Sequence, residues 1–286
     1  MDLTEIFRTP NPAIGVVHLL PLPTSPRWQG DLRAVVARAE QEATALAAGG
    51  AHGLIVENFF DAPFPKSRVD PAVVSAMTMV VQRIKHLVTL PIGINVLRND
   101  ARSALAIAAC TGASFIRVNV LTGVMATDQG LIEGEAHNFL RYRRELGADI
   151  KILADVLVKH ANPVGVADIT TAVEDTIQRG LADGIILSGL ATGKSPNTAE
   201  LQTARAAAGE TPVLIGSGAN AKNIAKFIRF ADGAIVASAL KRKGQIDQPI
   251  DPIRVREFVT ALEQGVATCD ETVSATSHSV AIRSGG

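Results

Sequence analysis

Short runs of apolar residues alternate with longer amphipathic segments along most of this chain. Each run is rich in Ile, Val and Leu, which is typical of strands that are covered on both faces. Such strands are usually parallel and are joined by helices. Eight of them are predicted, over residues 13–19, 53–58, 91–96, 114–120, 150–158, 184–189, 212–218 and 233–239.

A helical pattern follows each predicted strand. The first helix opens on Asp31 and ends on Gly50, and the second opens on Asp70 followed by Pro71. These residue types are the usual start and stop signals of helices. The predicted helices cover residues 31–50, 70–87, 99–113, 135–149, 168–184, 197–210, 220–233 and 251–265.

Eight strand–helix units in a chain of 286 residues predict a single (β/α)8 barrel, or TIM barrel, over residues 1–264. An open doubly wound sheet is the alternative. A dinucleotide-binding sheet would carry its glycine motif after the first strand, where this chain has HLLPLPTSPRW. Residues 265–286 are small, polar and aperiodic, which predicts a disordered C-terminal tail.

Composition and charge narrow the functional classes. Lys plus Arg and Asp plus Glu both total 28, so the chain lacks the basic excess typical of nucleic-acid binding, and we expect no nucleic-acid partner. The N-terminus does not resemble a signal peptide, and no apolar stretch approaches the length of a membrane span. We therefore expect a cytoplasmic protein, with attachment to a membrane surface left open. A homo-oligomer is the commonest state for such a protein.

In this fold the working residues lie at the carboxyl ends of the strands and in the loops that follow. Seven of the eight predicted strand ends carry polar or charged side chains. Buried charge is costly unless it is paired, so this rim indicates a functional pocket. The alternative is a structural ion-pair network in which Arg117 pairs with Asp155 or Glu57. The catalytic candidates are His18, Glu57, Asp155 and Lys159; the ligand-binding candidates are Asn95, Arg117, Asn119, Ser188, Gly189, Gly216, Ser217, Gly218 and Ser238.

Small residues end the seventh and eighth predicted strands. Gly216, Ser217 and Gly218 lie at the end of the seventh strand, and Ser238 lies between two alanines at the end of the eighth. In many TIM barrels these two loops bind a phosphate group, often with the N-terminus of a short helix. The pattern predicts a phosphorylated small molecule as the ligand. The alternative is that the glycines merely end a strand.

Two further loops have a composition that suggests a role at the rim. Residues 188–197 are glycine-rich and contain Lys194, which predicts a lid or a contact to an anionic ligand. The spacing GLATGKS is one residue short of a P-loop, which argues against a nucleoside triphosphatase. Residues 120–136 form a long acidic loop, and long loops in compact domains are usually functional or mobile. This loop could fold over the rim.

A metal site is the less favoured interpretation of the charged rim. His18, Glu57, Asp155 and His160 could converge on a divalent ion, but the nearby Lys159 would oppose a cation. We therefore predict no metal, and the sequence leaves the identity of any cofactor unknown. Lys159 could instead form a Schiff base, if desolvation lowered its pKa, or it could neutralise a carboxylate or a phosphate.

The segments just described carry a family resemblance. The chain resembles the BtpA/SgcQ family over roughly residues 10–264, through IGVVHLLPLPTSPRW, GAHGLIVENFFDAPF, FIRVNVLTGVMATDQGLIEGEA, ILADVLVKHANP, DGIILSGLATGKSP and PVLIGSGAN. The resemblance implies a TIM barrel close to the ribulose-phosphate-binding barrels. It also implies a factor for photosystem I biogenesis, which supports stable accumulation of the reaction-centre proteins. Its partners would be photosystem I assembly components, and it would be peripheral on the thylakoid membrane.

The family also has members in non-photosynthetic cells, and it has no settled reaction. An enzyme therefore stays open as the alternative, namely a lyase or isomerase acting on a small phosphorylated substrate. In that case Glu57 or Asp155 would act as the base, and Lys159 or His18 as the acid or electrophile. The candidate amides at the rim would orient the substrate.

Overall fold

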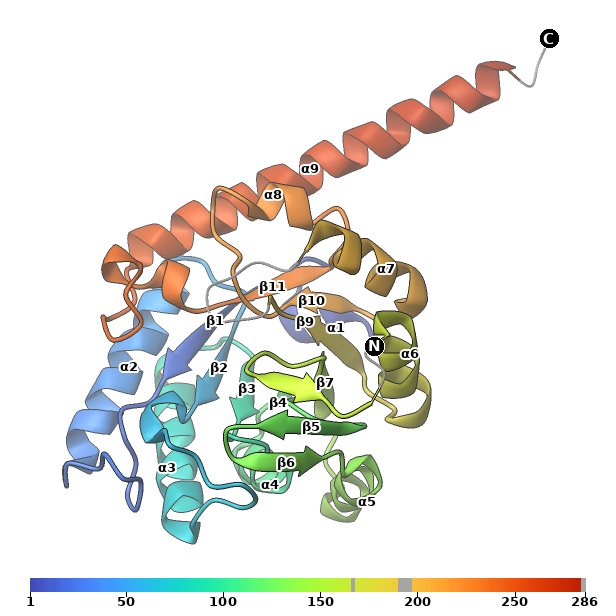
Figure 1. Cartoon of the computed structure of the whole chain (residues 1–286). Coiled ribbons are helices and arrows are strands. Elements are labelled where there is room, and N and C mark those ends of the chain that lie inside the picture. Colours follow the sequence, from blue (N-terminus) through green and yellow to red (C-terminus); the bar gives the residue numbers. More distant parts are fainter. Residues whose placement is uncertain (166–167, 190–196, 284–286) are drawn as a thin grey trace.

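Eight parallel strands close into a barrel in the order β1-β11-β10-β9-β7-β4-β3-β2 (Figure 1). The structure, a computed structural model, describes residues 1–165, 168–189 and 197–283, and it describes side chains as far as residue 269. Every predicted strand is present in the predicted order, so the single TIM barrel is confirmed. The barrel strands are β1 (Ala13–His18), β2 (Gly53–Glu57), β3 (Ile92–Asn95), β4 (Phe115–Val118), β7 (Lys151–Val156), β9 (Gly184–Leu187), β10 (Val213–Ile215) and β11 (Gly233–Val236).

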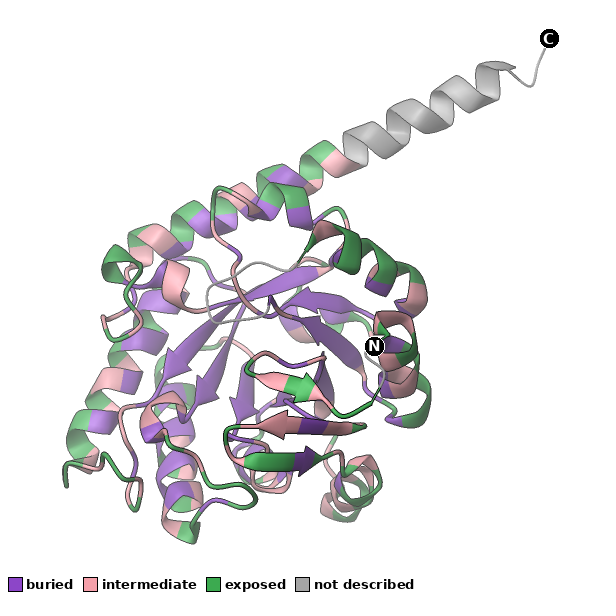
Figure 2. Cartoon of the chain, in the orientation of Figure 1, coloured by how far each residue is buried: buried purple, intermediate pink, exposed green. Residues whose placement is uncertain are grey.

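Helices cover the outside of the barrel, and the strands within it are buried (Figure 2). The predicted start signals work as caps, since the side chains of Asp31 and Asp70 each accept hydrogen bonds from backbone N–H groups in the first turn. The helical segments are α1 (Leu3–Phe7), α2 (Leu32–Ala48), η1 (Phe59–Asp61), α3 (Pro71–Leu87), α4 (Ala101–Thr111), α5 (Ala136–Leu146), α6 (Ile169–Glu174), η2 (Asp175–Arg179), α7 (Thr198–Ala208), α8 (Ile224–Phe227), η3 (Ser238–Leu240), η4 (Arg242–Gly244) and α9 (Pro252–Arg283).

The amino end of the barrel interior is filled with apolar side chains. Helix α1, which the sequence pattern did not predict, closes this end with Leu3 and Phe7. The Phe7 ring packs edge-on against Phe115, with ring centroids 5.4 Å apart. Gly93 makes room for Phe115, because a Cβ at position 93 would lie 2.1 Å from that ring. The remaining inward residues of this layer are Ile14, Val16, Ile55, Leu153, Ile186, Leu214 and Ile235.

A small antiparallel sheet lies outside the barrel, in the order β6-β5-β8. Its strands are β5 (Val124–Thr127), β6 (Gly130–Glu133) and β8 (Ala161–Pro163). The first two strands form a hairpin within the predicted long loop, and Asp128 and Gln129 occupy its two-residue turn. The third strand comes from the loop after β7. The long loop is therefore an ordered hairpin that is tied to a second loop of the rim.

The sequence predicts a disordered tail over residues 265–286, and helix α9 extends into this range. Helix α9 does not end at the barrel boundary but continues to Arg283. Neither Gly nor Pro occurs between Val266 and Arg283, so nothing in the backbone chemistry interrupts the helix. Its first turns bury Phe258 and Leu262, and Gly265 lies so close to α8 that a Cβ there would be 2.7 Å from the Cα of Ala225.

Candidate functional site

The polar candidates lie on the barrel strands one layer beyond the apolar filling. Side chains alternate between the two faces of a strand, so the second residue after an inward apolar residue also points inward. This two-residue spacing places the candidates together at the carboxyl end of the barrel, the mouth. The successive inward residues are Val16 and His18, Ile55 and Glu57, Gly93 and Asn95, Phe115 and Arg117, Leu153 and Asp155, Ile186 and Ser188, and Leu214 and Gly216.

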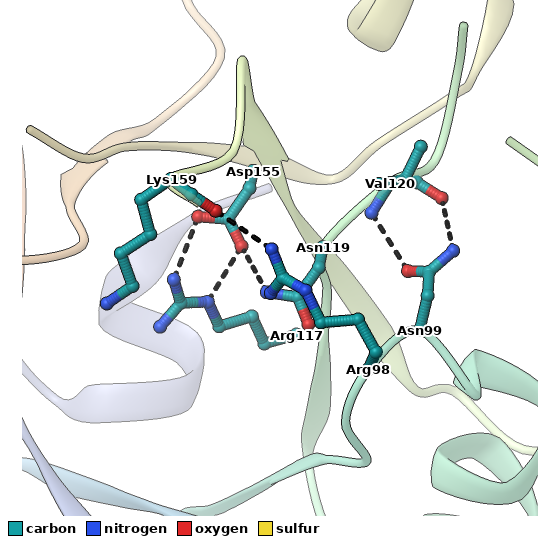
Figure 3. Close-up of polar contacts among 7 residues, drawn as sticks. All are labelled: Arg98, Asn99, Arg117, Asn119, Val120, Asp155 and Lys159. Carbon is teal, nitrogen blue, oxygen red and sulfur yellow. Dashed lines mark hydrogen bonds and ion pairs between the residues drawn. The ribbon is translucent and has the colours of Figure 1, made fainter. Parts of the chain in front are cut away.

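A buried ion pair crosses the mouth between β4 and β7 (Figure 3). Arg117 donates two hydrogen bonds to Asp155, of 2.9 Å from Nε and 2.8 Å from Nη2. Asn119 Nδ2 donates a third, of 2.9 Å, to Asp155 Oδ2. Both carboxylate oxygens are therefore occupied, and the ion pair that the sequence left open between Arg117 and Asp155 is formed.

Two connected cavities open in the mouth. A recess of about 40 Å³ lies against the loops after β10 and β11, and a cleft of about 600 Å³ lies outside it. The cleft is in the usual size range of small-molecule sites, and the recess is large enough for a small polar group. Both cavities are lined by Glu57, Phe59, Arg117, Lys159 and Ile246.

The predicted phosphate loops line the recess. Gly216, Ser217, Gly218 and Ser238 all contribute to its wall, and Gly218 has a φ of +79°, which favours glycine. The short helix predicted after the eighth strand is only the three-residue turn η3. Gly216 also has a packing role, because a Cβ at this position would lie 2.4 Å from the side chain of Ile186.

Some predicted site residues lie behind the cavity walls rather than on them. Among the described residues, Asn95, Ser188, Gly189 and Asp155 line neither the recess nor the cleft. Both polar atoms of the buried Asn95 amide, and the Ser188 hydroxyl, lack a hydrogen-bond partner within this part of the chain. These groups can support the mouth from below, but they do not form its surface.

His18 lies at the floor of the recess in a largely apolar setting. Its ring stacks on Phe59 with centroids 4.3 Å apart, and its Nε2 is 3.6 Å from Glu57 Oε1. Burial, followed by the positive charge of Lys241, lowers the pKa of His18 well below 6.5. His18 is therefore neutral at neutral pH and does not form a charged pair with Glu57.

Glu57 and Lys159 have opposite pKa shifts in the same cavities. Burial raises the pKa of the Glu57 carboxyl above 4.5, and it lowers the pKa of the Lys159 amine below 10.5. Each group is thus shifted toward its neutral form. A carboxyl group with a raised pKa and an amine with a lowered pKa can act as general acid and general base near neutral pH.

Arg98 is a further cation of the mouth. It was not predicted from the sequence, because it lies in the loop after a strand and not at the strand end. It is buried, and its Nη2 donates a hydrogen bond of 2.8 Å to the main-chain carbonyl of Lys159 (Figure 3). The sequence offered one signal, since Arg98 lies three positions after the strand-end Asn95. The cleft also gains an apolar wall from Phe60, Phe64 and Leu97, and Arg27, Asp128, Gln129 and His160 complete its rim.

A second buried ion pair anchors the chain next to the recess. Lys241 directly follows η3, and its Nζ lies 2.8 Å from Glu42 Oε1 on α2. Arg38 Nε donates to the same oxygen at 2.8 Å. Because Lys241 and Glu42 are fully buried, the pair fixes this segment against the outside of the barrel.

The described residues contain no group of three or more His, Cys, Asp or Glu side chains placed to hold a metal ion. The convergence considered for His18, Glu57, Asp155 and His160 therefore does not occur, and one reason is that Arg117 occupies Asp155. The loop containing Lys194 lies outside the described residues, so its predicted role as a lid stays a prediction.

The sequence matches the BtpA family over residues 9–264. The chain belongs to the BtpA family. It is 70% identical to the Photosystem I biogenesis protein BtpA of Synechocystis, over 93% of each chain. Other relatives include an uncharacterised protein of Pyrococcus furiosus, 47% identical over 87% of this chain and 93% of its own, and an uncharacterised mitochondrial protein of Caenorhabditis elegans, 32% identical over 90% and 95%.

Solved structures resemble this BtpA-family barrel in fold. Tryptophan synthase of Mycobacterium tuberculosis matches with a TM-score of 0.55 at 19% identity, over 91% of this chain and 95% of its own. N-(5'-phosphoribosyl)anthranilate isomerase of Pyrococcus furiosus matches with a TM-score of 0.53 at 14% identity, over 89% and 100%. At such identities the likeness supports the TIM-barrel fold alone.

Proposed function

We propose that this chain is a factor for photosystem I biogenesis that supports stable accumulation of the reaction-centre proteins. The observation that carries the proposal is its 70% identity to the Synechocystis protein of that name, over 93% of both chains. Such identity extends over nearly the whole length of both chains. Components of photosystem I assembly are accordingly the proposed partners.

The proposal also places the protein peripherally on the thylakoid membrane. None of the helices in the described part of the chain is long and apolar enough to cross a bilayer. The formal net charge is zero, which gives no general attraction to anionic lipids. We therefore propose that a protein partner, rather than lipid electrostatics, holds the chain at the membrane.

Complementation tests this function. A Synechocystis strain lacking its own BtpA would express this chain, and reaction-centre protein levels would be measured by immunoblot. Restored photosystem I levels, with part of the chain in the thylakoid fraction, are expected. A stable, folded chain that leaves photosystem I levels unchanged, or that stays wholly soluble, would contradict the proposal.

A second function is favoured by the mouth itself, namely binding of, and enzymatic action on, a small phosphorylated molecule by lyase or isomerase chemistry. The supporting observation is that Glu57 and Lys159 meet in cavities that also contain Arg117 and the small-residue loops. Two cations, Arg117 and Lys159, line the recess with a single carboxylate, Glu57, and Arg98 lines the adjoining cleft. The excess positive charge favours an anion, and relatives in an archaeon and a nematode suggest a role beyond photosynthesis.

Calorimetry with inorganic phosphate and glycerol phosphate tests the recess. Ser238→Asp places a negative charge in its wall and should weaken phosphate binding at least about tenfold, equivalent to roughly 1.4 kcal/mol. Ser75→Asp on the exposed face of α3 is the matched control and should bind as the parent does. Equal binding by the two variants would refute the recess as the phosphate site.

A further inference from the structure

Lys159 stands at the junction of the two cavities. Its side chain lines both the recess and the cleft. Figure 3 shows this side chain running past the Asp155 carboxylate, with its amine on the Arg117 side. Within the described residues the amine forms neither a hydrogen bond nor an ion pair within 4.0 Å, because Arg117 and Asn119 occupy Asp155. The nitrogen is therefore available to a molecule in the mouth.

We propose that Lys159 is a nucleophile whose amine forms an imine with the carbonyl group of a short phosphorylated aldehyde or ketone. The inference rests on the phosphate-binding mouth proposed above and names the substrate class for it. The Nζ lone pair attacks the carbonyl carbon, and the carbonyl oxygen is protonated and leaves as water when the C=N bond forms. Water hydrolyses the imine in the reverse direction, so the step requires no oxidant, reductant or further reactant.

The surroundings of the amine favour the neutral form that attacks a carbonyl. Burial lowers the pKa of Lys159, and the neighbouring charge of Arg117 lowers it further. Arg98, from the loop after β3, acts in the same direction. Glu57 on β2 and Asp155 on β7 act in the opposite direction, but Arg117 already compensates the charge of Asp155.

Glu57 is placed to exchange the proton that imine formation requires. It lines the same two cavities as Lys159, and burial raises the pKa of its carboxyl. A carboxyl that retains its proton closer to neutral pH can donate it to the departing oxygen and recover it during hydrolysis. Glu57 is therefore the proposed acid and base of the step.

The backbone around Lys159 is held in place. Arg98 binds its main-chain carbonyl, and β8 begins two residues later and pairs with β5. Leu157 and His160 have φ values of 50° and 57°, a left-handed conformation that is unfavourable for residues other than glycine. Unfavourable backbone conformations persist where the surroundings fix them, and they gather at functional sites. The amine is therefore presented by a fixed loop.

Reductive trapping tests the inference. The full chain would be incubated with dihydroxyacetone phosphate, or with dihydroxyacetone as the phosphate-free control, in the presence of sodium cyanoborohydride. The reductant converts any imine to a stable amine, and peptide mass spectrometry locates the adduct. We expect modification at Lys159 to exceed that at any exposed lysine several-fold, because burial lowers the pKa of this amine and raises its neutral fraction. Inorganic phosphate should slow the modification.

Two substitutions sharpen the trapping experiment. Lys159→Arg keeps a cation but removes the nucleophile, so the adduct at this position should disappear. Lys226→Arg changes an exposed lysine of α8 and should leave trapping at Lys159 unchanged. Circular dichroism checks that both variants fold, and the trapping of the unaltered chain is decisive even if one of them does not.

The outcomes separate the imine from the phosphate site. Modification spread evenly over exposed lysines, or absent from Lys159, would overturn the inference, since a lysine that only balances a phosphate charge stays protonated. If calorimetry detects phosphate binding but reductive trapping yields no adduct at Lys159, the phosphate site is supported and the imine is refuted. Equal trapping by both ketones would support the imine and contradict the phosphate site.

Discussion

The two ends of the barrel interior are built on the same strands but have opposite chemistry. At the amino end, Phe115 and Leu153 are packed among aliphatic side chains, and Phe7 of α1 closes the layer. Two positions further along the same strands, Arg117 and Asp155 are equally buried but charged. Burying apolar side chains stabilises the fold, whereas burying charge does so only when the pairing is complete. The amino end therefore supplies stability, and the mouth keeps charges that folding does not require.

Breaking the ion pair of the mouth should give the largest effect. Arg117→Leu leaves Asp155 buried without its partner, and the loss in free energy of unfolding should be about 3–5 kcal/mol. Urea denaturation measures it. The double variant Arg117→Leu/Asp155→Leu should recover most of this loss, because both charges are then gone. A double variant as unstable as the single one would show that the mouth contributes to stability as the amino end does.

Truncating the apolar layer tests the other side of the comparison. Leu153→Ala, two positions before Asp155, should cost about 2–5 kcal/mol through lost burial and the cavity left behind. Phosphate affinity, measured by calorimetry on the folded variant, should not change. A loss of affinity with unchanged stability would contradict the division of roles between the two ends.

The buried carboxyl of Glu57 should make the free energy of unfolding depend on pH, which the apolar side chains of the amino end do not. Its pKa is raised in the folded state, so its favourable contribution is complete below pH 4.5 and is lost as the pH rises through the folded value. Glu57→Gln lacks this loss, so it should gain stability relative to the parent as the pH rises from about 4 to 7. The size of this gain measures how far folding raises the pKa of Glu57. Denaturation curves across this range measure the difference, and a constant difference would be evidence against a buried carboxyl with a raised pKa.

Lys159 should show the smallest effect on stability and the opposite pH dependence. Its pKa is lowered on folding, so its contribution is present above pH 10.5 and is lost as the pH falls through the folded value. Lys159→Met should therefore be slightly more stable than the parent at pH 7, on the order of 0.5 kcal/mol, and the gain should vanish above pH 10.5. Thermal melts at pH 7 and 11 check this sign; a variant less stable at pH 7 would mean that the amine has a structural partner.

Sequence periodicity was sufficient for the barrel because each strand is a continuous apolar run and several helices, α2, α3, α4, α6 and α7 among them, begin at a side-chain N-cap. Strand ends also located His18, Glu57 and Lys159 correctly at the mouth. Which candidates reach a cavity surface was not predictable. Asp155 lies behind the cavity wall, paired with Arg117. This pairing depends on which strands are neighbours and not on spacing along the chain.

Residues outside the strand ends were missed for a related reason. Arg98 lies in the loop after β3 and Phe59 in the short helix η1, and no local periodicity marks either residue. Helix α1 is too short for a periodic signal, and its place under the barrel is fixed by the Phe7–Phe115 contact. Small polar residues after residue 264 favoured a disordered tail, whereas the absence of Gly and Pro between Val266 and Arg283 is compatible with the extension of α9.

The pairing of β5 with β8 joins two loops that leave the barrel from different strands. The turn residues Asp128 and Gln129 border the cleft on one side of this pairing, and Lys159 lies just before it on the other. The border of the outer cleft and the amine at the recess are therefore held in one register by main-chain hydrogen bonds. A molecule that spans both cavities must match this fixed separation.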